Sequence, residues 1–286
     1  MAEILDGKLV SQKIRDEISV EISGFKEKYS INPTLAVIMV GDNPASSVYV
    51  RNKHKACISV GIRSLDVSLP SSISEKELLA KIDELNNSPE IHGILVQLPL
   101  PSHISEKSVI NAISPKKDVD AFHPINVGRL MTGTADLLPC TPAGIIEILG
   151  AYGISPEGKN CVVIGRSNIV GKPMLHLLLN MNGTVTVCHS KTQELSSITK
   201  RADIIVAAVG KPAFLTADMV KEGAVVIDVG INRTAERGLV GDVDFEGVSK
   251  VASYLTPVPG GVGPMTITML MKNTLLAAKM QVEEKN

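Results

Sequence analysis

The chain carries a tyrosine and a lysine at a spacing that could serve proton-transfer chemistry. Tyr49 and Lys53 stand four residues apart within residues 45–60, a segment whose pattern predicts a helix, so both side chains project from one helical face. An amine beside a phenol is a pair that can pass or orient a proton. A solvated lysine beside a surface tyrosine would show the same spacing, and the sequence alone leaves both interpretations open.

Further polar groups follow stretches that should be buried strands. Gln97 comes directly after the apolar run 94–96, and open α/β sheets bind ligands beyond the carboxyl ends of their strands. A lone glutamine there also serves as a hydrogen-bonded loop anchor. Asp118 and Asp120 lie in the charged connection 116–122, where carboxylates are often solvated or cap a helix. Asp120 is the better candidate for a pocket because an alanine and a phenylalanine follow it.

A third stretch has the form of a phosphate-binding turn. Residues 161–164 read as a buried strand, Gly165 as a tight turn, and a helix should begin near Val170. Free backbone N–H groups and a helix N-terminus at one point attract phosphate. The spacing departs from G-x-G-x-x-G, since Ser167 replaces the middle glycine and Gly171 comes one place late. An ordinary strand–turn–helix remains the alternative.

The next expected strand, 184–188, indicates which dinucleotide would bind. NAD-selective folds carry an acidic residue near the end of this strand to bind the ribose hydroxyls, and none is present. Ser190 and Lys191 follow instead, and Arg166 supplies a second cation in the preceding turn. Hydroxyls and cations suit a 2′-phosphate, which favours NADP over NAD. A polar surface loop is the alternative interpretation.

Strands and helices should alternate along both halves of the chain, which predicts an α/β fold with parallel sheets. Ile231 follows a strand expected at 224–228 and therefore lies at the edge where a cofactor would bind. Gly260 and Gly261 lie in 257–264, a proline- and glycine-rich segment that we expect to form a shaped loop. A helix should follow from Met265. In the helix expected from about 141, Thr141 would be the N-cap and Pro142 the first helical residue. Apolar spacing also predicts helices at 10–29, at 45–60 and from 74, and strands at 35–40, 65–69 and 204–207.

The length of 286 residues favours two domains. We expect a first domain at 1–121, onto which a C-terminal helix at 265–281 packs back, and a Rossmann-like domain at 122–286. The net charge of −1, with four Phe, four Tyr and no Trp, argues against nucleic-acid binding. No apolar run approaches the roughly 20 residues that span a bilayer.

The four cysteines show no paired spacing, the acidic stretch at residues 1–10 does not have the form of a signal peptide, and we expect no metal site. A reducing cytoplasm is therefore the expected location.

Five stretches of the chain match one family in the same order. They are residues 49–53, 96–101, 117–120, 165–167 with 170–173, and 257–266. Together they resemble the bifunctional methylenetetrahydrofolate dehydrogenase/cyclohydrolase, or FolD, family, and the likeness runs over residues 4–274. Ala121 is a departure, because the family often has glycine at this position.

The resemblance implies two reactions in a folate cleft between two α/β domains. 5,10-Methylenetetrahydrofolate would be oxidised with NADP⁺ to the 5,10-methenyl form, which water would then open to 10-formyltetrahydrofolate. It also implies a cytoplasmic homodimer acting on a folate that carries a glutamate tail. Two alternatives stay open: a dehydrogenase of this fold without cyclohydrolase activity, and a non-catalytic module that binds NADP and a protein partner.

The resemblance assigns roles to particular residues. Lys53 matches the family's catalytic lysine, Tyr49 its tyrosine, Gln97 its glutamine and Asp120 its pterin-binding aspartate. Gly260 and Gly261 would let the backbone close on the folate. The expected cofactor-binding residues are Gly165, Arg166, Ser167, Ser190, Lys191 and Ile231.

Overall fold

The computed structural model describes residues 1–234 and 238–283, which fall into two compact units. Unit 1 comprises Met1–Gln12 and Thr141–Thr266, and unit 2 comprises Lys13–Cys140 and Ile267–Asn286. The chain therefore passes between the units within three helices: α1 (Gly7–Tyr29), α6 (Cys140–Ala151) and α10 (Val262–Glu283).

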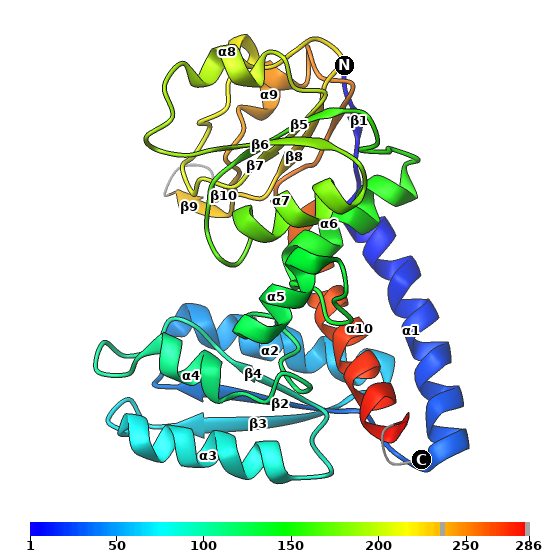
Figure 1. Ribbon diagram of the computed structural model, residues 1–286, viewed down its shortest axis with the longest axis vertical. Coiled ribbons are helices and arrows are strands. Elements are labelled where there is room, and N and C mark those ends of the chain that lie inside the picture. The colour runs from blue at the N-terminus through cyan, green and yellow to red at the C-terminus, as the bar shows by residue number, and fades with distance from the viewer. Residues whose placement is uncertain (235–237, 284–286) are drawn as a thin grey trace. The chain divides into compact units, whose positions relative to one another are not determined.

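Unit 1 is built on a parallel sheet of six strands in the order β1-β11-β8-β7-β5-β6 (Figure 1). The strands are β1 (Glu3–Ile4), β5 (Asn160–Ile164), β6 (Thr184–Cys188), β7 (Ile204–Ala207), β8 (Val225–Asp228) and β11 (Tyr254–Leu255). β7 and β8 are buried along their whole length, which is why β7 is an unbroken apolar run and β8 is apolar up to its last residue, Asp228. The α/β class and the expected strands are confirmed.

Short helices and one hairpin complete unit 1. They are α7 (Gly171–Asn180), α8 (Leu195–Thr199), the 3₁₀ turn Ala217–Met219, α9 (Phe245–Val248), and the antiparallel pair β9 (Asn232–Thr234) and β10 (Gly238–Val240). α7 begins one residue after the expected position.

Unit 2 contains a smaller parallel sheet in the order β3-β2-β4. Its elements are α1, β2 (Thr34–Val40), α2 (Pro44–Val60), β3 (Arg63–Leu69), α3 (Glu75–Asn87), β4 (Gly93–Val96), α4 (Glu106–Ala112), α5 (Pro124–Thr132) and the main part of α10. A capping box begins α3, where the Ser74 hydroxyl accepts from the Glu77 amide and the Glu77 carboxylate accepts from the Ser74 amide. Apolar residues of α3 and α4 pack on this sheet.

Three helix starts differ by more than one residue from the sequence prediction. α1 begins at Gly7, before the expected start at residue 10. α6 begins at Cys140, so Thr141 and Pro142 lie inside its first turn rather than at the N-cap and first helical positions. The Thr141 hydroxyl is instead 2.9 Å from the Thr266 hydroxyl. α10 begins at Val262, before the expected Met265. Pro264 does not prevent this start, because it falls within the first turn, where a helix tolerates the missing N–H.

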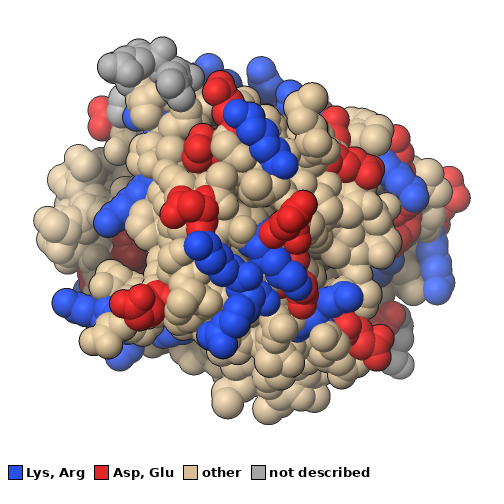
Figure 2. Space-filling view, turned by 90° about the horizontal axis from the view of Figure 1, so that it is seen from above, with Lys and Arg blue, Asp and Glu red and all other residues tan. Residues whose placement is uncertain are grey.

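The surface carries charges of both signs. Figure 2 shows acidic and basic side chains interspersed on the face that it presents, as the net charge of −1 leads one to expect. Among the described residues, no helix combines the length and the apolar character that crossing a membrane requires.

Asn273 ties α10 to the rest of unit 2. Its buried side-chain amide donates to the carbonyl oxygens of Val119 and Leu138, both at 2.8 Å. Removing a buried partner leaves these carbonyls unsatisfied, which is costly in a site without water. The bond to Val119 also fixes the backbone directly before Asp120, which is the next residue in the chain.

We predict that Asn273→Ala lowers the free energy of unfolding by about 1–3 kcal/mol, since two buried carbonyls lose their donor. Urea denaturation measures this change. Asn87→Ala is the matched control, because that amide bonds an exposed carbonyl on its own helix and its loss should cost less than about 0.5 kcal/mol. Equal stability losses in the two variants would contradict the anchoring role of Asn273.

Candidate active site

A hydrogen bond joins Lys53, on α2, to Gln97, directly after β4. The Lys53 amine donates to Oε1 of Gln97 at 2.9 Å, and Nε2 of Gln97 donates to the Leu98 carbonyl at 2.7 Å. The backbone of Gln97 is fixed as well, because its amide donates to Ile38 of β2 at 2.8 Å. With its NH₂ group engaged by Leu98, the glutamine turns its oxygen toward the amine, an orientation that the sequence leaves open.

Tyr49 lies one helical turn before Lys53 on α2. It is 45% exposed, so this aromatic residue is accessible to solvent on the same helix as Lys53.

The two aspartates of the following loop have different environments. Asp118 is buried, and its Oδ2 accepts from the His123 amide at 2.8 Å and from Nδ2 of Asn126 at 2.9 Å, so it holds the loop together. Asp120 is near enough to Lys53 for their charges to interact. Burial raises the pKa of Asp120 to about 6, against the lowering effect of Lys53. Asp120 is partly buried, and its raised pKa brings its ionisation closer to neutral pH than that of a solvated aspartate.

Cys140 is a member of this cluster that sequence reasoning missed. Its sulfur lies 3.4 Å from the Val119 carbonyl, 3.9 Å from Oδ1 of Asp120 and 3.7 Å from Nδ2 of Asn273. Burial raises the pKa of this thiol well above its usual value, so it is a neutral donor. The only sequence signal is its place at the expected helix start.

Ala121 adopts a backbone conformation that explains the glycine often found there in the family it resembles. Its φ of 57° is in the left-handed region, which glycine adopts without steric cost. Ala121 adopts this conformation directly after Asp120, so alanine in place of glycine leaves the type of turn at this point unchanged.

The turn of unit 1 that the sequence offers as a phosphate site is tightly packed. Gly165 has φ 129°, and a Cβ added to it would collide with the Ala208 carbonyl, while one added to Gly171 would collide with the Gly165 carbonyl. Both positions therefore require glycine. The Ser167 hydroxyl accepts from the amides of Val170 (3.1 Å) and Gly171 (3.4 Å).

Ser167 also corrects one expectation. The first amides of α7 are bonded within the turn and are not free for a phosphate. Arg166 and Ser167 are exposed, so an anion would meet this loop and the positive end of the helix dipole.

The other expected cofactor residues stand at the same edge of the sheet. Ser190 and Lys191 are exposed directly after β6, in a loop held by bonds from the His189 amide to the Thr192 hydroxyl and from the Lys191 amide to Nδ1 of His189. Ile231 is 50% exposed, after the end of β8. Because β6, β5, β7 and β8 are neighbours, these residues follow one another along the carboxyl edge.

Gly260 and Gly261 are buried in unit 1 rather than open to a ligand. The Gly260 carbonyl accepts from the Lys8 amide at 3.1 Å, and a Cβ added to Gly7 would collide with the Gly261 carbonyl. Gly260 has φ 115°, and a Cβ added to Gly261 would crowd the Pro257 carbonyl and the Thr256 side chain, so the loop's own backbone accounts for glycine at both positions. Contact with folate stays a prediction.

Within the described residues, no three side chains of His, Cys, Asp or Glu are grouped so that they could hold a metal ion. The polar groups that are brought together are an amine, an amide, a carboxylate and a thiol in unit 2, and a glycine turn with exposed cations in unit 1.

Comparisons with known proteins agree along the chain. Residues 5–120 match the model of the tetrahydrofolate dehydrogenase/cyclohydrolase catalytic domain, and residues 139–282 match that of the NAD(P)-binding domain. The bifunctional protein FolD of Acetivibrio thermocellus is 59% identical over 284 residues, covering 99% of both chains.

Solved structures of similar proteins superpose well. The bifunctional FolD enzyme of Campylobacter jejuni has a TM-score of 0.96 at 54% identity, covering 98% of this chain and 99% of that one. FolD of Trypanosoma brucei, solved with NADP cofactor and an inhibitor, has a TM-score of 0.94 at 39% identity, covering 98% of each chain. The chain belongs to the tetrahydrofolate dehydrogenase/cyclohydrolase family.

Proposed function

We propose that this protein oxidises 5,10-methylenetetrahydrofolate to 5,10-methenyltetrahydrofolate with NADP⁺ and then hydrolyses that product to 10-formyltetrahydrofolate. The observation that carries the proposal is the bond between Lys53 and Gln97, with the carboxylate of Asp120 close enough for its charge to interact with the amine. Family membership and the names of the relatives support both activities.

The first step depends on positioning. When bound, NADP⁺ accepts a hydride from the folate methylene. The chain would hold the folate through Asp120, whose two oxygens can accept from the pterin amino group and ring N–H, and through the exposed ring of Tyr49. Gly165, Arg166 and Ser167 would receive the pyrophosphate, while Ser190 and Lys191 would receive the 2′-phosphate.

The second step needs a group that takes a proton from water and returns one to the departing folate nitrogen. Lys53 is the residue that fits, because its amine is held by Gln97 rather than free in solvent. Gln97 is thereby a positioning group. A lysine N–H can donate to the glutamine oxygen whether the amine is charged or neutral, so the contact can persist while the proton moves.

A dehydrogenase without cyclohydrolase activity is the second candidate. The fixed orientation of Lys53 favours the bifunctional enzyme, because hydride transfer alone needs no proton carrier at this place. A non-catalytic NADP-binding module would not form NADPH from methylenetetrahydrofolate in a single-turnover assay, whereas our proposal requires it.

We further propose that the protein is a cytoplasmic homodimer, that residues 1–121 form the folate-binding catalytic domain, and that residues 122–286 bind NADP. Its four cysteines are free and buried, which fits a reducing compartment. A polyglutamate tail of the substrate would find Arg51 and Lys55, two exposed cations on α2. Resemblance to the family supports the dimer.

Lys53→Met should lower the rate of methenyltetrahydrofolate hydrolysis by at least about 100-fold, because a positioned acid–base group contributes roughly 10²–10⁴. The loss of methenyl absorbance measures this rate. Circular dichroism and NADP affinity should match those of the parent. Lys76→Met, which alters an exposed lysine of α3 in the same unit, should hydrolyse normally. If Lys53→Met hydrolysed methenyltetrahydrofolate as fast as the parent, the role assigned to Lys53 would be wrong.

Asp120→Asn should weaken folate binding by at least about tenfold and stabilise the protein at pH 7.5. Because burial raises the pKa of Asp120 from 3.8 to about 6, the native state binds more protons than the unfolded state between these values. Stability therefore falls as pH rises from about 4 to 6, and above pH 6 the buried charge costs up to about 3 kcal/mol.

Urea unfolding tests this prediction. The variant should exceed the parent in stability at pH 7.5 and lose that advantage at pH 4. Asp83→Asn, an exposed carboxylate of α3, should show no such difference. An Asp120→Asn protein that is less stable than the parent at pH 7.5 would contradict the proposed ionisation.

Lys191→Glu should raise the Kd for NADP⁺ at least about tenfold and leave the Kd for NAD⁺ nearly unchanged, since only NADP carries the 2′-phosphate. Titration calorimetry with both cofactors measures the effect. Lys200→Glu, an exposed lysine of the same unit, is the charge-matched control. Equal losses for the two cofactors would reject the 2′-phosphate assignment.

A further inference from the structure

Two buried carboxylates lie at the carboxyl edge of the unit 1 sheet and have no part in the function described so far. Asp228 is the last residue of β8 and is 3% exposed, while Asp242 follows β10 and is 0% exposed. Buried carboxylates are rare and costly unless donors surround them, so their partners indicate what they do.

Asp228 holds the backbone around Asp242. Its Oδ1 accepts from the amides of Gly230 (2.9 Å) and Asp242 (2.8 Å), and its Oδ2 accepts from the amide of Val243 (3.0 Å). A Cβ added to Gly241 would collide with Oδ2 of Asp228. The chain is therefore shaped to bring this segment close to Asp228.

Asp242 in turn accepts four hydrogen bonds from two loops, which is as many as its two carboxylate oxygens can accept. Its Oδ2 accepts from the amides of Val209 (2.6 Å) and Gly210 (2.9 Å), in the loop that follows β7. Its Oδ1 accepts from the amide of Lys211 at 2.9 Å and from Nδ2 of Asn232 at 2.8 Å. One side chain thus fixes both the loop after β7 and the end of the loop after β8.

Ile231 is the residue that this arrangement presents. Its neighbour on one side, Gly230, donates to Asp228, and its neighbour on the other side, Asn232, donates to Asp242. The isoleucine between them is 50% exposed. An exposed apolar residue whose two neighbours are fixed occupies a definite position against which a ligand can pack.

The order of strands indicates which part of a dinucleotide would meet it. Lys191 follows β6 and Gly165 follows β5, and the sheet continues through β7 to β8. A cofactor with its 2′-phosphate at Lys191 and its pyrophosphate at the Gly165 turn extends its other half over the ends of β7 and β8. That half carries the nicotinamide.

We propose that Asp242, held in place by Asp228, is a positioning residue that fixes the loops after β7 and β8 where the nicotinamide half of NADP binds. This inference rests on the proposed NADP-dependent function. It separates the cofactor site into two parts: Lys191 and the Gly165 turn bind the adenosine half, and the carboxylate-bound loops bind the redox half.

Asp242→Asn tests the inference in the full-length protein. Asparagine keeps the shape but has one acceptor oxygen, and its NH₂ group would face backbone N–H donors, so the loops lose at least two of their four bonds. Calorimetry would compare NADP⁺ with adenosine 2′,5′-bisphosphate, which lacks the nicotinamide half. We expect the Kd for NADP⁺ to rise about tenfold and that for the bisphosphate to change less than about twofold.

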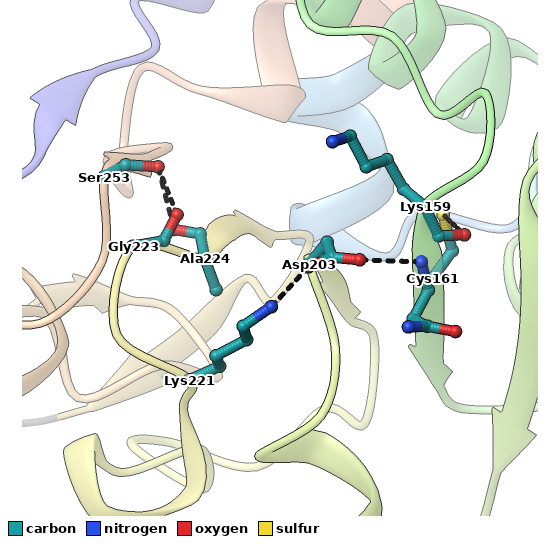
Figure 3. A network of polar contacts seen from close by, with 8 residues as sticks. Lys159, Cys161, Asp203, Lys221, Gly223, Ala224 and Ser253 are labelled. Atoms are coloured by element: carbon teal, nitrogen blue, oxygen red, sulfur yellow. Dashed lines mark hydrogen bonds and ion pairs between the residues drawn. The ribbon is translucent and has the colours of Figure 1, made fainter.

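Asp203→Asn is the matched control at the opposite edge of the same sheet. Asp203, shown in Figure 3, accepts from Nζ of Lys221 at 2.6 Å and from the Asn160 amide at 2.9 Å. Like Asp242, Asp203 is a carboxylate that accepts from a backbone amide, so the substitution is chemically similar. It lies at the amino ends of the strands, away from the proposed cofactor site. The affinities for NADP⁺ and for the bisphosphate should both stay at the parent values.

Asn232→Ala gives a second and milder test, because it removes a single bond to Asp242 and does not depend on whether Asp242→Asn folds. It should raise the Kd for NADP⁺ about threefold without changing that for the bisphosphate. Equal weakening of both probes, or no change in NADP⁺ affinity, would overturn the inference. A parent protein that binds neither probe would refute the cofactor assignment itself and the inference with it.

Discussion

The candidate active site depends on a lysine amine being held at one point in space. A free lysine samples many rotamers, and fixing it costs conformational entropy that some contact must offset. Gln97 supplies that contact, and its own amide is fixed by the Leu98 carbonyl and by pairing of its backbone with β2. The register of a three-stranded sheet therefore determines where the amine lies.

Both units use buried polar groups to shape the loops that follow their strands. In unit 2, Asn273 donates to the Val119 carbonyl and Asp118 accepts from the His123 amide, so the two side chains hold the backbone on both sides of Asp120. In unit 1, Asp228 and Asp242 do the same for the loops after β7 and β8. Loops carry function only when a scaffold makes their conformation definite, and here side chains that touch no substrate do so.

The sequence predicts the longer strands and helices well, but it gives no expectation of shorter elements such as β1, β11, α5 and α8. Apolar runs predict β5, β7 and β8, and the spacing of Ser74 and Glu77 predicts the start of α3, because these signals are local. The cluster around Cys140 could not be foreseen, since its partner Asn273 stands 133 residues away. Likewise, Ser167 departs from the glycine motif, and only the structure shows that its hydroxyl accepts from the amides of Val170 and Gly171 at the start of α7.

The account's central claim is that Lys53 and Gln97 act as one unit in the hydrolysis step. A double-mutant cycle of Lys53→Met and Gln97→Met, read as the rate constant for hydrolysis of methenyltetrahydrofolate, tests it most directly. Groups that act together lose their effect together, so the double variant should be no slower than Lys53→Met alone. A double variant slowed by the product of the two single effects would show that the residues act independently and would contradict the account.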